Sequence, residues 1–506
     1  MKNRKKLVLA ATVALLVVLC VLTCSCSSNG SYKGNYLYSG TPSPYTTESG
    51  DEFTRILENP FVETAHAASS YFSIDANTSS YPVLRRLIRE GREIDPDAVR
   101  VEEMLNYFSY DYAEPEDGKI LALSASMFDS PYNPETKLLT IGLSAQKVQF
   151  TAQRNNVIFL IDTSGSMYGD DRLGLVQTAF KMLTDNLNDD DRVSIVTYAG
   201  SSSVPLSGAY GSEKQKINAV IEDLSASGST AGAQGIQTAY QLAQQYFISG
   251  GNNRVVLATD GDFNVGISDT KKLESFIKEK AKSGVYLSVF GVGIGNLKSE
   301  KMEALALNGN GTASYLDSPT EARRALVEQI GGTMQTVAKD VKAGITFDPD
   351  YVQSYRLIGY ENKLMTEEEF NNTEKDAGEL GSGHTVTVTY ELKLTDKAFV
   401  AGENIGAVEI HYKPTENSNT QEQGDLILTL DVKTDNYHQT MTPNDTFVSS
   451  VVEFALIARN SQYKANASLD NVIERLTQYQ TSDEYKQEFF ELVKAYKRNY
   501  ANTEAK

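Results

Sequence analysis

Strand-like apolar runs alternate with helical patterns across the middle of this chain, from about residue 155 to residue 334. This alternation predicts an α/β fold, a mostly parallel doubly wound sheet with helices on both faces. The first run, residues 157–161, is apolar at every position, which is typical of a strand buried on both sides. We expect strands near residues 157–161, 192–198, 254–259, 285–291 and 312–316, and helices near residues 172–187, 213–224, 232–247, 270–282, 299–306 and 320–334.

Acidic and hydroxyl side chains follow two of these runs, where each strand is expected to end. Residues 162–166 read Asp-Thr-Ser-Gly-Ser, and residues 259–262 read Thr-Asp-Gly-Asp. Residues 228–230 add a hydroxyl from a Gly- and Ser-rich loop. Ligands of a doubly wound sheet bind outside the carboxyl ends of the strands, where the strand order reverses, and we expect both strands to flank that point. One rim would then collect the oxygens of Asp162, Ser164, Ser166, Thr230 and Asp260.

This set of oxygens suits a hard divalent cation. Mg²⁺ prefers six oxygen ligands and keeps several waters, so carboxylates and hydroxyls together leave room for an outside ligand. We expect Mg²⁺ or Mn²⁺, and Ca²⁺ only after them. The alternative is that residues 162–166 simply turn a strand into a helix through local backbone bonds. Three loops with matching side chains favour the metal over that alternative.

The order of these side chains resembles the metal-ion-dependent adhesion site of von Willebrand factor A domains. The resemblance implies that Ser164, Ser166 and Thr230 contact the metal through their hydroxyls. It implies that Asp162 and Asp260 bind it directly or through ordered water, and that a carboxylate of a protein partner takes the open position. We expect the nearby Asp262 to form the turn or to support the ligands rather than to bind the metal.

Two further segments resemble the N-terminal module of a bacterial family of von Willebrand factor A-domain lipoproteins. They are residues 72–75, Phe-Ser-Ile-Asp, and residues 106–110, Asn-Tyr-Phe-Ser-Tyr. The resemblance continues through the A domain to near residue 500, and so covers most of the chain outside the leader.

The first residues predict export and attachment to a membrane. Four basic residues precede the apolar run 7–22, as in a secretory signal peptide of residues 1–25. The following cysteines resemble a bacterial lipoprotein cleavage box, with Cys26 favoured for lipidation and Cys24 as the alternative. An uncleaved anchor remains possible, and both outcomes place the protein outside the cytoplasm on a membrane. All three cysteines, Cys20 included, lie in this leader, so we expect no disulfide in the folded domains.

Changes of pattern along the chain predict several parts. Residues 119–150 alternate as a β-hairpin, and the alternation returns after the A domain, so we expect one sandwich into which the A domain is inserted. The final helices read as a cap on that sandwich rather than as a partner-binding segment. The expected parts are a signal peptide at 1–25, a flexible tether at 26–50, an N-terminal α-rich module at 51–118, the hairpin at 119–150, the A domain at 155–334, a β-rich domain at 338–440 and C-terminal helices at 446–500.

Composition and missing motifs narrow the function. The net charge of −19 argues against nucleic acid as a partner, and no phosphate-binding loop supports a nucleotide. The four histidines are widely separated, which disfavours a zinc hydrolase, and we expect no enzyme activity. We therefore predict an adhesion or recognition protein that holds an acidic partner through its metal. The alternatives are an envelope structural or assembly factor whose metal only stabilises the fold, and, behind it, a metal-dependent hydrolase.

Overall fold

The computed structural model describes most of the chain after its first 43 residues. The described residues are 44–46, 50–74, 76–148, 154–229, 232–261, 270–295, 297–329, 332, 334–397, 399–418 and 420–504. The predicted signal peptide, most of the tether, both lipidation candidates, Thr230 and Asp262 lie outside them. In the described part, no helix is both long and apolar enough to cross a membrane.

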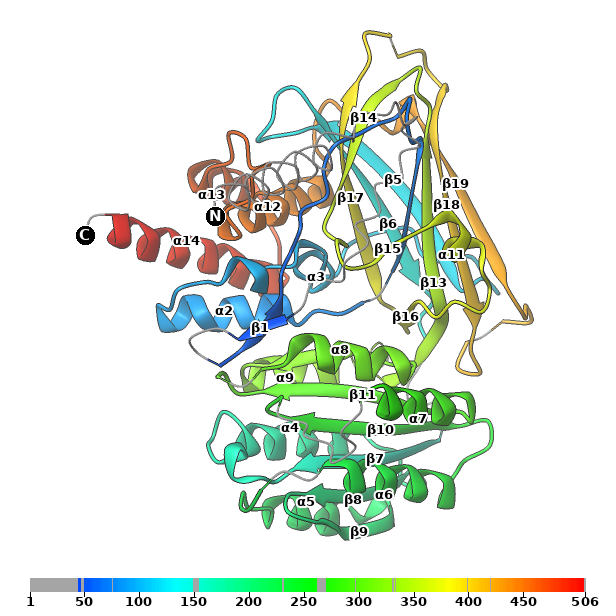
Figure 1. The fold of residues 1–506 in the computed structure, drawn as a ribbon, viewed down its shortest axis with the longest axis vertical. Helices are drawn as coiled ribbons and strands as arrows, with labels where there is room; N and C mark the ends of the chain where they lie inside the picture. The colour runs from blue at the N-terminus through cyan, green and yellow to red at the C-terminus, as the bar shows by residue number, and fades with distance from the viewer. Residues whose placement is uncertain are drawn as a thin grey trace, which may run out of the picture. The chain divides into compact units, whose positions relative to one another are not determined.

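A six-stranded sheet forms the middle of the chain, drawn in green in Figure 1, and we call residues 155–334 the parallel-sheet domain. Its strand order is β12-β11-β10-β7-β8-β9, so the order reverses between β7 and β10, as the sequence predicts. All neighbouring pairs are parallel except β8 with the edge strand β9. The strands are β7 Asn155–Asp162, β8 Arg192–Tyr198, β9 Ser202–Tyr210, β10 Asn252–Thr259, β11 Val285–Val292 and β12 Ala313–Leu316.

Helices cover both faces of this sheet, which confirms the predicted fold class. Alternate residues of β7 serve the two faces: Ile158 and Leu160 pack in one core cluster, and Val157 and Phe159 pack in the other. The first face carries α6 Gly232–Gln245, α7 Thr270–Lys282 and α8 Ser299–Asn308. The second carries α4 Leu173–Asp185, α5 Lys214–Glu222, α9 Pro319–Arg323 and the π-helical turn η5 Arg324–Glu328.

Two antiparallel sheets form one β-sandwich. Its strands come from the chain before the parallel-sheet domain and from the chain after it. One sheet has the order β15-β4-β13-β18-β19 with β16 paired to β13, and the other has the order β3-β14-β17-β6-β5. Their inward side chains share one core cluster. The strands are β3 Val62–Glu63, β4 Ser69–Ser73, β5 Leu121–Asp129, β6 Lys137–Ala145, β13 Thr336–Phe347, β14 Val352–Ile358, β15 Leu364–Met365, β16 Gly378–Gly381, β17 Thr385–Leu394, β18 Asn404–Pro414 and β19 Leu426–Lys433, with the short helix α11 Glu367–Asn371 beside them.

Residues 51–118 differ from the separate α-rich module that the sequence suggests. Strand β3 pairs with β14, and β4 pairs with β13, so this stretch contributes a strand to each sandwich sheet. A further short strand, β2 Glu52–Thr54, pairs with β1 Pro44–Thr46. The helices of this stretch share a core cluster with those of the C-terminus, namely α2 Ser80–Glu90 and α3 Val101–Asn106 with α12 Pro443–Ala458, α13 Leu469–Gln478 and α14 Glu484–Glu504.

The parallel-sheet domain differs from the expectation in two places. Strand β9 is not among the strands expected from the sequence. Pairing with β8 on one side is enough to hold this edge strand. The helix predicted over residues 320–334 is present in its first part but is not one regular α-helix: α9 gives way to the π-helical turn η5, which ends at Glu328, and residues 332 and 334 are helical again before β13 begins at Thr336.

One turn between β16 and β17, residues 381–384, holds the chain on both sides of the parallel-sheet domain; we call it the junction turn. On the entry side, the Gly383 amide donates to the Gln146 carbonyl over 2.9 Å, and the His384 carbonyl accepts from Ala145 over 2.9 Å. On the exit side, the Ser382 amide donates to the Gln335 carbonyl over 2.8 Å. The two connections are therefore fastened to the sandwich at one place.

Candidate functional site

Two neighbouring strands bring the predicted acidic residues to the same rim. Strands β7 and β10 are parallel and in register up to Ile161 opposite Ala258. The next residues are Asp162 and Thr259, and the Thr259 hydroxyl lies 3.3 Å from the Asp162 carboxylate as a hydrogen-bond donor. Asp260 follows directly. Both carboxylates are almost fully buried, with exposed fractions of 0% for Asp162 and 1% for Asp260.

The loop after β7 folds back on the first carboxylate. The Ser164 amide donates to Asp162 Oδ1 over 2.9 Å, a local bond that fixes the direction of the chain as it leaves the strand. The hydroxyl oxygens of Ser164 and Ser166 lie 3.0 Å apart. A carboxylate and two hydroxyls from residues 162–166 therefore lie together at the carboxyl end of β7.

The loop expected to carry the third hydroxyl reaches the same place. The Ser227 amide donates to the Thr163 carbonyl over 2.8 Å, and the Gly165 amide donates to the Gly228 carbonyl over 3.0 Å. Thr230 itself lies outside the described residues, as does Asp262. The structure thus brings together Asp162, Ser164, Ser166 and Asp260, while the position of Thr230 stays a prediction.

The electrostatics of the rim favour a positive guest. The pKa of the Asp162 carboxyl is raised from its ordinary 3.8 to about 6, chiefly by burial and to a smaller extent by the charge of Asp260, although hydrogen bonds from Ser164 and Tyr198 act to lower it. Two buried carboxylates on adjacent strands repel each other when both are ionised. A cation placed between them would relieve that repulsion.

Arg172, which the sequence analysis did not single out, already lies beside this rim. Its Nη1 is 4.0 Å from Asp260 Oδ2 and donates to the Ser166 carbonyl. Its Nη2 donates to the Ile294 carbonyl over 2.9 Å. The residue is the N-cap of α4, where a positive charge opposes the helix dipole. That unfavourable position is the sequence signal that indicates a tertiary role for the arginine.

The outer part of the rim is exposed and mostly acidic. Tyr168 has an exposed fraction of 84%, although the neighbouring Met167 is fully buried. Asp170 is exposed, and Asp171 forms an ion pair of 2.8 Å with Arg86 of α2. A partner that approaches the carboxylates therefore meets an aromatic side chain and negative charge first.

The donor set fits a hard divalent cation. Carboxylate and hydroxyl oxygens are the ligands that Mg²⁺ and Mn²⁺ prefer, and softer sulfur or imidazole ligands do not occur among the four side chains. Across the residues that the structure describes, no group of three or more His, Cys, Asp or Glu side chains is arranged to hold a metal ion. The rim differs from a group of that composition, because serine hydroxyls supply part of its proposed ligand set.

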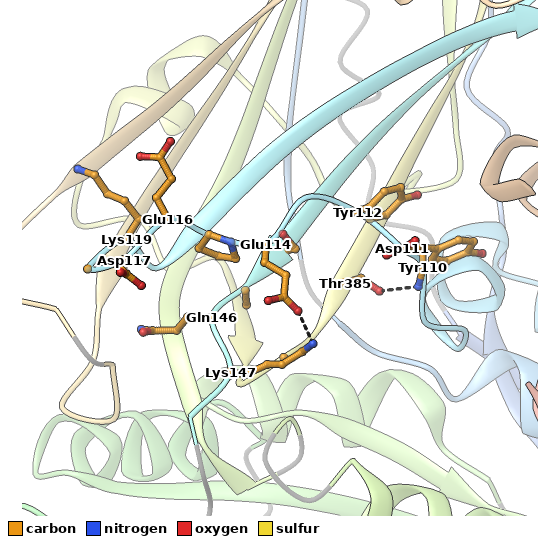
Figure 2. A pocket seen from close by; sticks show the side chains of 15 residues that line it. Tyr110, Asp111, Tyr112, Glu114, Glu116, Asp117, Lys119, Gln146, Lys147 and Thr385 are labelled. Atoms are coloured by element: carbon orange, nitrogen blue, oxygen red, sulfur yellow. Dashed lines mark hydrogen bonds and ion pairs between the residues drawn. The ribbon is translucent and has the colours of Figure 1, made fainter. Parts of the chain in front are cut away.

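A separate hollow of about 300 Å³ lies beside strand β6 of the sandwich, and Figure 2 shows the side chains that line it. The Glu114 carboxylate and the Lys147 ammonium group pair across it at 2.5 Å. Lys119, also on its wall, pairs with Glu422 at 2.7 Å. These charged groups are exposed and paired with each other, so the hollow offers no activated group comparable to the buried carboxylates of the rim.

Comparison with known protein families covers most of the chain in three parts. The von Willebrand factor type A domain family matches residues 156–329. A family described as von Willebrand factor matches residues 47–140, and one described as Uncharacterized protein YfbK, C-terminal, matches residues 332–498.

The chain is also similar to individual proteins. The chain is 42% identical to Uncharacterized protein YfbK of Escherichia coli (strain K12) over 365 residues, which cover 71% of this chain and 62% of that protein. It is 27% identical to inter-alpha-trypsin inhibitor heavy chain H4 of Homo sapiens over 39% of this chain and 22% of that one. Among solved structures, a von Willebrand factor type A protein from Catenulispora acidiphila aligns with 15% identity and a TM-score of 0.40, over 71% of this chain and 87% of that chain.

Proposed function

We propose, from the premise that this chain belongs to a bacterial family of von Willebrand factor A-domain proteins, that it holds a divalent cation at the rim of its parallel sheet and recognises an acidic protein partner through that ion. The family supports a role in protein interaction in general, and its A domains commonly hold a divalent metal. The observation that carries the proposal is the convergence of Asp162, Ser164, Ser166 and Asp260 at one strand reversal.

The residues of the rim divide the work of binding. Ser164, Ser166 and Thr230 would offer hydroxyl oxygens, and Asp162 and Asp260 would bind directly or through water. Bound Mg²⁺ or Mn²⁺ would supply a Lewis-acidic position for a carboxylate from outside. Hydroxyl ligands leave more of the positive charge uncompensated than carboxylates would, so the ion still attracts a Glu or Asp of the partner.

The proposal includes the setting of this interaction. We infer that a lipid on Cys26, or on Cys24, attaches the chain to a membrane outside the cytoplasm, where its acidic partner is a protein rather than a nucleic acid or a nucleotide. Exposed Tyr168 beside the rim supports protein contact, because exposed aromatic side chains are enriched where proteins bind each other. We propose no catalysis, because none of the four histidines of the chain belongs to this rim and a bound metal would occupy the hydroxyls of both serines.

The experiment is partner capture from a cell-envelope extract by the purified protein. We expect wild type to retain partners in excess Mg²⁺ and to release them on adding a chelator. Asp162→Ala should capture none, because the first carboxylate is lost. The matched control is Asp190→Ala, an exposed aspartate of the same domain, which should capture partners like wild type.

A second candidate function, a structural or assembly role in the envelope, gives opposite results. It is favoured by the burial of Asp162, since a metal there could simply stabilise the fold. Under that function, chelation would unfold the parallel-sheet domain, Asp162→Ala would be destabilised in the same way, and no partner would depend on free Mg²⁺. Retention of the same partners by the variant in chelator would therefore contradict recognition through the metal.

A further inference from the structure

Arg172 connects the loop that carries two of the proposed metal ligands to a second loop of the rim. Through Nη1 it binds the backbone carbonyl of Ser166, and through Nη2 it binds the carbonyl of Ile294, 2.9 Å away, just after β11. The planar guanidinium suits this task, because its donors point in fixed directions toward two acceptors at once.

The second loop is shaped to receive this side chain. Gly293 has φ +72°, and a Cβ at that position would lie 2.5 Å from Arg172 Nε, so a larger residue would displace the arginine. Nearby, the Tyr315 hydroxyl donates to the Gly293 carbonyl over 2.9 Å and accepts from Arg86 of α2. The position of the guanidinium is thus set by backbone and neighbours on both sides.

The N-terminal segment at residues 50–54 holds the same loop from outside. Asp51 is 4% exposed, and its Oδ1 accepts hydrogen bonds from the amides of Gly295, 2.8 Å away, and Leu297, 2.9 Å away. The Glu52 amide donates to the Leu297 carbonyl over 2.8 Å. Lys298 pairs with the Glu52 carboxylate at 2.6 Å.

We propose that Arg172 is a positioning residue of the metal site, and that through the loop 293–298 it couples the site to the N-terminal segment 50–54. This inference rests on the proposed function, because it concerns the ligand loop of the same site. Hydrogen bonds join every step: Ser166 to Arg172, Arg172 to Ile294, and the loop after Ile294 to Asp51. The segment just before Asp51 is the expected membrane tether, so the anchor and the site would share one loop.

The positive charge of Arg172, taken alone, would weaken metal binding, whereas its positioning role would strengthen it. A guanidinium 4.0 Å from Asp260 repels an incoming cation, so its removal should strengthen metal binding if charge were its only contribution. A positioning role requires the reverse, because a ligand loop that is no longer held loses affinity, typically about 10-fold to 100-fold when a supporting partner is removed. The sign of the change therefore separates the two.

The test is Mg²⁺ affinity by calorimetry on the purified protein and its variants. We expect Arg172→Gln and Arg172→Lys both to weaken binding by about tenfold, since neither can bond both carbonyls in the same geometry. Asp51→Ala should weaken it by roughly threefold, and the double variant with Arg172→Gln should be no weaker than Arg172→Gln alone, because both act through one loop. The control is Glu58→Ala, whose side chain contacts Gln462 and Arg459 instead, and it should leave affinity unchanged.

Amide exchange at Gly295 and Leu297 supplies a readout that does not need the metal. Arg172→Gln should speed exchange at both amides, while exchange within β7 stays as in wild type. Affinity that rises in Arg172→Gln, or that Arg172→Lys restores fully, overturns the positioning role; unchanged affinity in Asp51→Ala overturns the coupling. If wild type takes up no Mg²⁺, the proposed function fails. Unchanged exchange at these amides in Arg172→Gln would then show that the proposed coupling through Arg172 fails as well.

Discussion

Strands β7 and β10 lie side by side, yet their two ends carry opposite kinds of polar residue. At the amino end, neutral amides face each other: Asn252 Nδ2 donates to Asn155 Oδ1, and Asn156 Nδ2 donates to Asn253 Oδ1, each over 3.1 Å. At the carboxyl end, two buried carboxylates, Asp162 and Asp260, occupy neighbouring strands. Neutral amides can pair donor to acceptor, whereas carboxylates of like charge need a cation.

The surroundings of the two ends follow the same division. Near the amino end, Arg254 donates to Ser288 over 2.8 Å and to Thr336 of the sandwich strand β13 over 3.2 Å, and the junction turn closes over the connections. At the carboxyl end, Tyr168 and residues 227–229 are exposed. One end of the sheet is therefore built to hold the chain, and the other end is built to receive something from outside.

The largest loss of unfolding free energy should come from removing a buried amide side chain at the amino end of the strands. Asn253 is 2% exposed, and its side chain bonds Ile248, Gly251 and Asn156. Asn253→Ala leaves these buried groups unsatisfied, and we expect a loss of roughly 4 kcal/mol in unfolding free energy. Urea denaturation measures it. Asn308→Ala, which removes one bond within α8, should cost less than about 1 kcal/mol, and equal losses would contradict the comparison.

Acid should next weaken the junction turn. Burial, together with the smaller effect of the Arg324 charge, lowers the pKa of His384 from its ordinary 6.5 to about 4. Because the unfolded chain binds the proton first, stability from neutral His384 is complete above pH 6.5 and is lost as the pH falls toward 4, by about 3 kcal/mol in all. Urea midpoints between pH 7.5 and 4.5 (roughly the window of that shift) should fall, and His384→Asn should flatten the fall. A variant with the wild-type slope would contradict this origin.

At the carboxylate end, we expect a smaller change in unfolding free energy, and an increase instead of a loss. Without metal at pH 8, well above the Asp162 pKa of about 6, the buried carboxylate is ionised and unfavourable. Asp162→Asn removes that charge and should raise the unfolding free energy by about 2 kcal/mol. With Mg²⁺ added, only wild type should gain stability, since only it binds the ion. Thermal melts in chelator and in Mg²⁺ measure both changes; a destabilised metal-free variant would remove the contrast between the two ends.

The smallest effect on stability should come from the exposed rim. Tyr168→Ala removes a side chain that is 84% exposed, so the unfolding free energy should change by less than about 0.5 kcal/mol. Capture of the partner should nevertheless fall, because the side chain lies next to the metal-binding loop. Melting and capture measured on one preparation separate these outcomes, and unchanged capture would exclude Tyr168 from the docking surface.

The sequence predicts what local pattern encodes. Continuous apolar runs predicted the parallel strands, and the residues after them led to Asp162 and Asp260, because strand ends are visible in a sequence. Strands β3 and β4 were missed, since their partners lie almost 300 residues away and short strands carry little pattern of their own. The role of Arg172 was missed for the same reason: both its carbonyl acceptors depend on the tertiary fold.

The central claim, that this rim binds a divalent cation, is tested most directly by titrating Mg²⁺ into the metal-free protein in a calorimeter. The account predicts saturable uptake of a single ion by wild type, and no uptake by Asp162→Ala, whose fold is verified by its melting curve. Absence of uptake by wild type, or uptake by Asp162→Ala with wild-type affinity, would contradict it.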